Sequence, residues 1–90
     1  MLSEVEKLGP RGRLFMRQPY RGHFISVSVI YDTPNHYQFT PVVEIRRPKL
    51  NEVLNTIVTK QAFNTIQMAT EFGFGLGREW VDERLLEFPE

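Results

Sequence analysis

The residues of this sequence that could serve metal chemistry are few and separated. Asp32 and His36 flank the first predicted turn, and His23 lies at the start of the first predicted strand. A zinc site needs three or four such ligands, and the sequence has no other histidine and no cysteine to complete one. Asp32 is typical of a turn, because its side chain hydrogen-bonds its own backbone. We therefore expect no metal-binding residue.

Candidate residues for catalysis or nucleotide binding also lack the required surroundings. No Gly-x-Ser-x-Gly turn of the kind that exposes a catalytic serine surrounds Ser26 or Ser28. The segment GFGLG at 73–77 lacks the glycine spacing of a phosphate loop and lies inside a predicted helix. The acidic residues near the C-terminus indicate a solvated helix face. We expect no catalytic residue, no cofactor-binding residue and no cofactor, and thus a protein that is not an enzyme.

The composition predicts one small soluble domain. Ninety residues, 41% of them hydrophobic, suffice for one core, and the absence of cysteine excludes disulfides. No secretory h-region and no run of membrane-spanning length is present. These features favour a cytoplasmic protein with no membrane partner.

Charge is unevenly distributed, although the formal net charge is zero. Residues 1–23 carry a net charge of +3, residues 71–90 a net charge of −4, and the middle contributes +1. Because polyanion-binding domains are usually basic overall, a net charge of zero disfavours nucleic acid. The asymmetry favours contact between the basic and acidic segments. We expect arginines of the first segment to dock on the acidic helix end, with Phe15 or Met16 covering Phe74 or Leu85; these arginines are Arg11, Arg13 and Arg17.

Alternating apolar residues predict a β-hairpin. The period of two runs through about residues 22–31 and 37–47, and the intervening Asp32-Thr33-Pro34-Asn35 is a turn sequence. Pro41 has no N–H to donate, so it indicates an edge position, a bulge or a break in the second strand.

Residues 48–60 fit two structures. Apolar residues recur at helical spacing from Leu50, but the stretch is also rich in β-branched residues, and a hairpin needs a third element for stability. A third strand at about 53–60 is favoured, with a helix as the alternative.

A long amphipathic helix is predicted at about 65–86. Asn64 with Gln67, or alternatively Thr65, caps its start. Trp80 is the expected anchor of its buried side, against Val27, Phe39 or Val43. An i, i+4, i+8 stripe of small residues predicts close approach to another element; the stripe consists of Ala69, Gly73 and Gly77.

The predicted class is therefore α+β, with a three-stranded antiparallel sheet packed by one C-terminal helix. Residues 22–90 form this single β-β-β-α domain. Residues 1–21 are predicted to be a basic flexible arm, in which 3–8 is either a short helix or unstructured.

Two short motifs resemble a group of short uncharacterised bacterial β-β-β-α proteins. They are the Tyr20-Arg21-Gly22 opening and the helix pattern Phe63-x-Thr65-x-x-x-Ala69 … Arg78-Glu79-Trp80-Val81-Asp82. The resemblance covers about residues 20–84. It implies a bacterial protein with this fold and no particular function.

Two function classes remain. The leading hypothesis is a non-catalytic protein–protein or self-association module, because a sheet covered on one side leaves an apolar patch on the other. The alternative is a nucleic-acid-binding accessory protein that uses the basic arm. The candidate partner-binding residues are Arg11, Arg13, Arg17, Arg21, Phe24, Ile30, Val42, Leu86 and Phe88.

Overall fold

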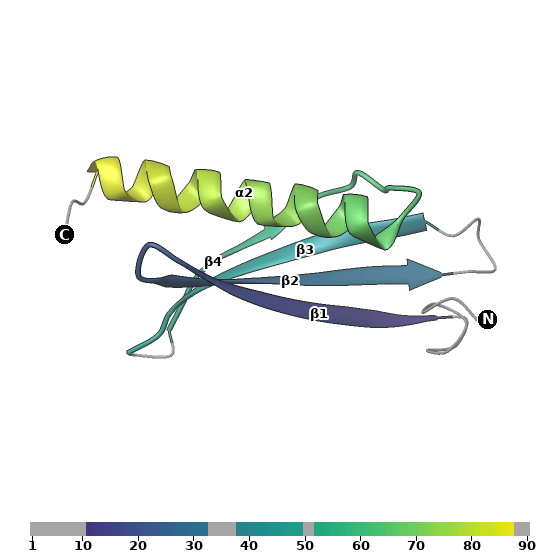
Figure 1. Cartoon of the computed structure of the whole chain (residues 1–90), viewed down its shortest axis with the longest axis horizontal. Helices are drawn as coiled ribbons and strands as arrows, with labels where there is room; N and C mark the ends of the chain where they lie inside the picture. Colours follow the sequence, from purple (N-terminus) through teal and green to yellow (C-terminus); the bar gives the residue numbers. More distant parts are fainter. Residues whose placement is uncertain (1–10, 33–37, 50–51, 88–90) are drawn as a thin grey trace.

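A computed structural model describes residues 11–32, 38–49 and 52–87 and places them in two layers. A four-stranded antiparallel sheet forms one layer, and one long helix lies along one of its faces (Figure 1). The strands lie in the sheet in chain order. An antiparallel sheet followed by one C-terminal helix confirms the α+β class. The elements are β1 (Arg11–Tyr20), β2 (His23–Asp32), β3 (Gln38–Arg47), β4 (Glu52–Val58) and α2 (Ile66–Glu87).

The sheet has four strands where three were predicted. Residues 11–20, which we assigned to a flexible arm, form β1 and pair with β2 over their whole length. The prediction was wrong here because arginines and a proline interrupt the apolar alternation of this segment. β2, β3, β4 and α2 lie within two residues of their predicted bounds, and β4 settles the alternative at 48–60 in favour of a strand. Residues 1–10, including the short helix considered at 3–8, lie outside the described residues.

A tight turn joins β1 to β2. Tyr20 pairs with His23, and the two residues between them, Arg21 and Gly22, have φ angles of 47° and 78°. Positive φ at both positions is the mark of a type I′ turn, whose twist matches that of an antiparallel hairpin. Gly22 takes this conformation without steric cost, whereas Arg21 is held in it.

Pro41 lies where the ladder between β3 and β4 is interrupted. Pairing with β4 ends at Val42 and Val58, and Phe39 then exchanges two backbone hydrogen bonds of 2.9 Å with Phe63. Backbone N–H groups of alternate residues in a strand point to the same side, so the nitrogen of Pro41, like that of Phe39, points away from β2. This nitrogen carries no hydrogen, and it faces the gap between the two pairings, where no hydrogen bond is needed. β3 itself is not broken, since Pro41 pairs with Val29 of β2; of the three predicted alternatives, Pro41 takes the edge position, at a point where β3 has no partner in β4.

The core lies between α2 and the two central strands. Side chains of β2 and β3 on the helix side are almost fully buried, including Val27, Val43 and Ile45. A Cβ placed on Gly73 would lie 2.8 Å from Val27 Cγ1, and one on Gly77 would lie 2.5 Å from Ile25 Cγ2. The stripe of small residues therefore lets the helix backbone rest directly on β2, as predicted.

The buried side of the helix is centred on the stripe of small residues, with Phe74 and Val81, and not on Trp80 as expected. Phe74 and Val81 are buried, while Trp80 is only partly buried and lies beside Ile57 and Leu76 toward β4. Trp80 is thus a flanking contact and not the central anchor. The helix begins after Thr65, whose Oγ1 accepts a 3.1 Å hydrogen bond from the Met68 N–H, so Thr65 is the cap.

Candidate interaction face

The sheet has an open face, defined here as the side opposite α2. Strand pairing places its side chains in rows that cross the sheet from β1 to β4. The Phe15 row consists of Phe15, Ser28, Val42 and Val58; the Arg17 row of Arg17, Ser26, Glu44 and Thr56; and the Phe24 row of Pro19, Phe24, Arg46 and Val53. Three of the predicted partner-binding residues, Arg17, Phe24 and Val42, are thereby brought together, and Ile30 lies beyond the Phe15 row.

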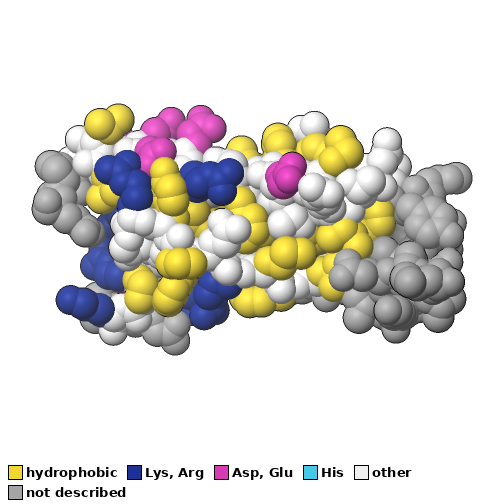
Figure 2. All heavy atoms as spheres, viewed as in Figure 1, with side chains coloured by type: hydrophobic (Ala, Val, Ile, Leu, Met, Phe, Trp, Pro, Cys, Tyr) yellow, Lys and Arg dark blue, Asp and Glu magenta, His cyan; other side chains and the backbone are white. Residues whose placement is uncertain are grey.

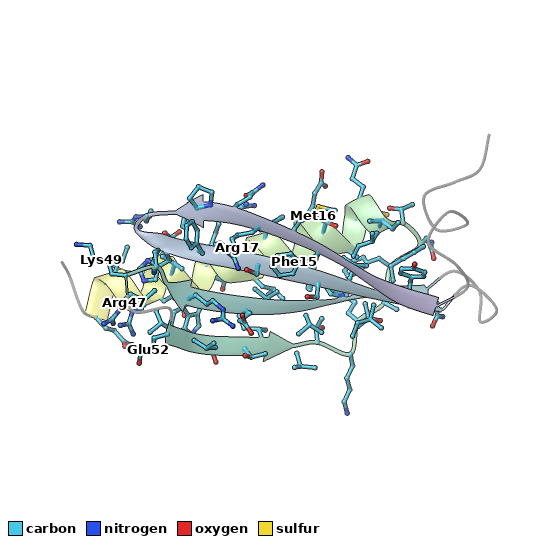
Figure 3. All side chains as sticks on the ribbon, turned by 90° about the horizontal axis from the view of Figure 1, so that it is seen from below. Phe15, Met16, Arg17, Arg47, Lys49 and Glu52 are labelled. Atoms are coloured by element: carbon cyan, nitrogen blue, oxygen red, sulfur yellow. The ribbon has the colours of Figure 1, made fainter. Side chains whose placement is uncertain are left out.

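Arg17 lies between two aromatic rings on this face. Its Cζ is 5.6 Å from the ring centroid of Phe15 and 5.3 Å from that of Phe24, and its Nε donates a 3.3 Å hydrogen bond to Ser26 Oγ. Figure 3 looks onto the open face and shows Phe15 and Arg17 rising from β1. A guanidinium over an aromatic face is attracted by the ring quadrupole. These contacts place the Arg17 guanidinium between the two rings on the β1–β2 part of the open face.

An ion pair lies on β3, also on the open face. Arg46 Nε donates a 2.5 Å hydrogen bond to Glu44 Oε1, and both side chains are about one-third exposed or less, at 27% and 34%. Glu44 places a carboxylate in the middle of the face, in the same row as Arg17. The face therefore carries both signs of charge.

Apolar side chains surround these charges and remain exposed. Phe15 is 57% exposed, Val58 72%, Ile30 42% and Val53 43%. Exposed apolar groups at contiguous positions of a sheet, rimmed by polar residues, are typical of interaction surfaces. The prediction of partner-binding residues omitted Phe15, Val53 and Val58, because the side of β4 that faces solvent follows only from the pairing with β3.

The acidic helix end is contacted by one arginine of the β1–β2 turn. Arg21 Nη1 lies 2.7 Å from Asp82 Oδ1, and the Tyr20 hydroxyl donates to Asp82 Oδ1 and Oδ2 at 2.9 and 3.1 Å. The hydrogen bond from Arg21, followed by that from Tyr20, lowers the pKa of the Asp82 carboxyl. The hydrogen bond to Asp82 is also the main reason why the pKa values of Tyr20 and Arg21 are raised.

The predicted docking of arginines on the helix is wrong for Arg17, which lies on the opposite side of the sheet. The side chains of Arg11 and Arg13 lie outside the described residues. Arg21 makes the contact instead, because the turn carries it past the edge of the sheet toward α2. Met16 does lie on the helix side, where it lines an open groove with Phe74.

The other predicted residues do not join the open face. Leu86 is 83% exposed near the end of α2, and Phe88 lies outside the described residues. His23 is buried, and its Nδ1 donates to the Arg21 carbonyl oxygen at 2.9 Å, which is a structural role for this ring. Asp32 pairs with Gln38 at the end of the hairpin, and His36 is not described.

Within the three described ranges, no group of three or more His, Cys, Asp or Glu residues is placed to hold a metal ion. None of the helices in that part of the chain is long and apolar enough to cross a membrane. Neither a family model nor a curated protein nor a solved structure matches this sequence.

Proposed function

We propose that this chain is a cytoplasmic, non-catalytic protein-interaction module whose binding surface is the open face. The observation that carries the proposal is Arg17 between Phe15 and Phe24, with exposed apolar residues around it. Arginine and aromatic side chains are enriched at the centres of protein interfaces, where they contribute large contact areas at little entropic cost.

The sheet geometry supports binding by this face. The contacts to both rings fix the Arg17 guanidinium before a partner arrives, so little rotamer freedom is lost on association. The strands beneath it are backed by the buried core, which makes the face a rigid platform. Val58 and Phe15 then supply apolar area that a partner removes from water.

The cluster of polar side chains with shifted pKa values also supports a binding function over a catalytic one. The Tyr20–Arg21–Asp82 cluster is the main set with shifted pKa values, and its members already satisfy one another. The shifted pKa values of this cluster have a structural explanation, because its hydrogen bonds join the β1–β2 turn to α2.

A nucleic-acid-binding accessory protein is the second candidate. It is favoured by the same Arg17, Phe15 and Phe24, because exposed aromatic rings with a cation on a four-stranded sheet suit the stacking of bases. It is disfavoured by Glu44, whose carboxylate lies in the middle of the face and pairs with Arg46. The protein-interaction proposal accommodates this carboxylate, since protein interfaces carry both signs of charge.

A photo-crosslinking experiment tests the proposal. A benzophenone amino acid replaces Val58 on the open face, and in a matched chain it replaces Met68, which is 50% exposed on the helix. We expect irradiation of native cells to give a discrete protein adduct from position 58 and none from position 68. Equal adducts from both positions, or none from position 58, would refute the open face as a protein-binding surface. An adduct removed by nuclease would favour the second candidate.

A further inference from the structure

We infer that the partner of the open face is a second copy of this chain. The two copies stack face to face about a two-fold axis that runs parallel to the strands, between β2 and β3. This inference rests on the proposed function and names its partner. The argument comes from the positions of side chains in the three rows.

A two-fold axis in this direction carries each row onto itself with its strand order reversed. β1 then faces β4 of the second copy, and β2 faces β3. In the Phe15 row, Phe15 faces Val58 of the other copy, so the two most exposed apolar side chains of the face cover each other. This pairing occurs twice, once on each side of the axis.

The polar residues are complementary under the same operation. In the Phe24 row, Phe24 faces Arg46 of the second copy, which suits a cation over an aromatic ring. In the Arg17 row, Ser26 faces Glu44 of the second copy, and Arg17 lies one strand spacing away from that carboxylate. Every charged residue in these rows therefore meets an opposite charge, a ring or a hydroxyl.

Charge disfavours one alternative two-fold arrangement of the stacked sheets. An axis running across the strands along the Arg17 row places Arg17 over Arg17 of the second copy and Glu44 over Glu44. Like charges brought face to face in a closing interface are strongly disfavoured. Complementarity in all three rows supports the axis parallel to the strands over an axis along the Arg17 row, and the parallel axis is compatible with the aligned packing of twisted sheets.

The size of the face indicates a dimer of modest affinity. Four strands spaced by about 4.8 Å, each rising about 3.3 Å per residue, give a face of roughly 600 Å² per copy. The total of about 1,200 Å² is at the lower limit for specific protein interfaces. Both helices remain on the outside of the dimer, where their acidic side chains face water.

Sedimentation equilibrium of the full chain tests the dimer. We expect a monomer–dimer equilibrium at micromolar concentrations. Val58→Lys should weaken the dimer at least tenfold, whereas Leu86→Lys should leave it unchanged. Both residues are highly exposed, at 72% and 83%, so neither change disturbs the monomer core. A chain that stays monomeric at 500 μM, or equal dimerisation by both variants, would overturn the inference.

Crosslinking tests the axis, since the chain has no cysteine of its own. Pro19→Cys and Val53→Cys are made in separate chains, because Pro19 faces Val53 of the second copy about the proposed axis. A short bis-maleimide should join the two variants when they are mixed and leave each variant alone largely unjoined. Two copies of Pro19 lie three strand spacings apart sideways, about 14 Å, in addition to the separation of the sheets. Efficient joining of Pro19→Cys to itself would refute this axis.

The two proposals fail in different ways. A position-58 photo-adduct with a mass other than twice that of the chain, from a protein that sediments as a monomer, would overturn the second copy and leave the open face as a binding surface. Absence of any adduct at position 58 would overturn both.

Discussion

At the residue scale, Asp82 connects the β1–β2 turn to the helix. Its carboxylate accepts hydrogen bonds from Tyr20 and Arg21, which come from a segment about sixty positions away in the chain. Because the bonds favour the charged form, Asp82 contributes stability above the ordinary aspartate pKa, and the contribution is lost as the pH falls through its lowered pKa. The contribution of Tyr20 to stability has the opposite pH dependence: it is present at lower pH and is lost as the pH rises through the raised pKa of Tyr20.

Asp82→Asn should therefore return the Tyr20 titration toward the ordinary tyrosine value. An amide still accepts a hydrogen bond but carries no charge, so it favours the protonated phenol less than a carboxylate does. NMR of the Tyr20 ring as a function of pH measures the midpoint. Glu83→Gln is the control, because Glu83 lies next to Asp82 in the sequence but outside the cluster. An unchanged midpoint in Asp82→Asn would contradict this account of the contact.

At the element scale, the separation of α2 from β2 is set by glycine. Gly73 and Gly77 lie against Val27 and Ile25, and side chains at these two positions would overlap with β2. Gly75, on the same helix, has no atom within 4 Å of the position where its Cβ would lie. All three glycines have helical backbone conformation, so alanine gains the same helix propensity at each position. A difference between the substitutions therefore reports the packing against β2.

Gly77→Ala should destabilise the protein by about 1–3 kcal/mol, because the new methyl group forces the helix away from Ile25. Gly75→Ala should stabilise it by roughly 0.5–1 kcal/mol, because alanine has the higher helix propensity and meets no neighbour. Urea unfolding followed by far-UV circular dichroism measures both free energies. Equal effects of the two substitutions would mean that the helix does not rest on β2 in this way.

At the scale of the whole molecule, the sheet and the helix carry opposite charge. Residues 11–60 contain eight Lys and Arg against three Asp and Glu, whereas α2 contains five Asp and Glu against two Arg. Figure 2 shows most of the visible acidic side chains gathered over the C-terminal part of the helix, with some Lys and Arg beside them and others lower, toward the sheet. Part of the positive charge lies near the turn between β3 and β4, where Arg47 and Lys49 extend outward (Figure 3). The carboxylate of Glu52 lies beside Arg47.

This distribution predicts weak binding of nucleic acid. Arg46 is bonded to Glu44, and Arg47 lies 4.0 Å from Glu52, so carboxylates accompany the cations of the sheet. We expect no gel shift of a 20-nucleotide single strand at 50 mM salt and micromolar protein, since each phosphate contact depends on an available cation. A shift that weakens steeply with added salt and is lost in Arg17→Ala would establish the nucleic-acid alternative.

The sequence by itself determined most of the elements. The alternation in β2 and β3 is a local signal, and β2, β3, β4 and α2 each lie within two residues of their predicted bounds. For β4 the sequence favoured a strand but left a helix as the alternative, and Thr65 was the alternative to Asn64 as the cap, so the structure decided both points. The close approach of α2 also followed from sequence, because glycines spaced by four on a helix have few explanations other than packing. What these signals share is that neighbouring residues along the chain carry all of the information.

Tertiary structure decided the remainder. β1 has weak alternation of its own and becomes a strand because β2 offers it a free edge and Arg21-Gly22 provides the turn. Arg17, Glu44 and Val58 belong to one surface only through strand register, which relates residues far apart in the sequence. Charge segregation predicted that an arginine meets the acidic helix end, but the turn selected Arg21, because only the paired strands fix which side chain reaches Asp82.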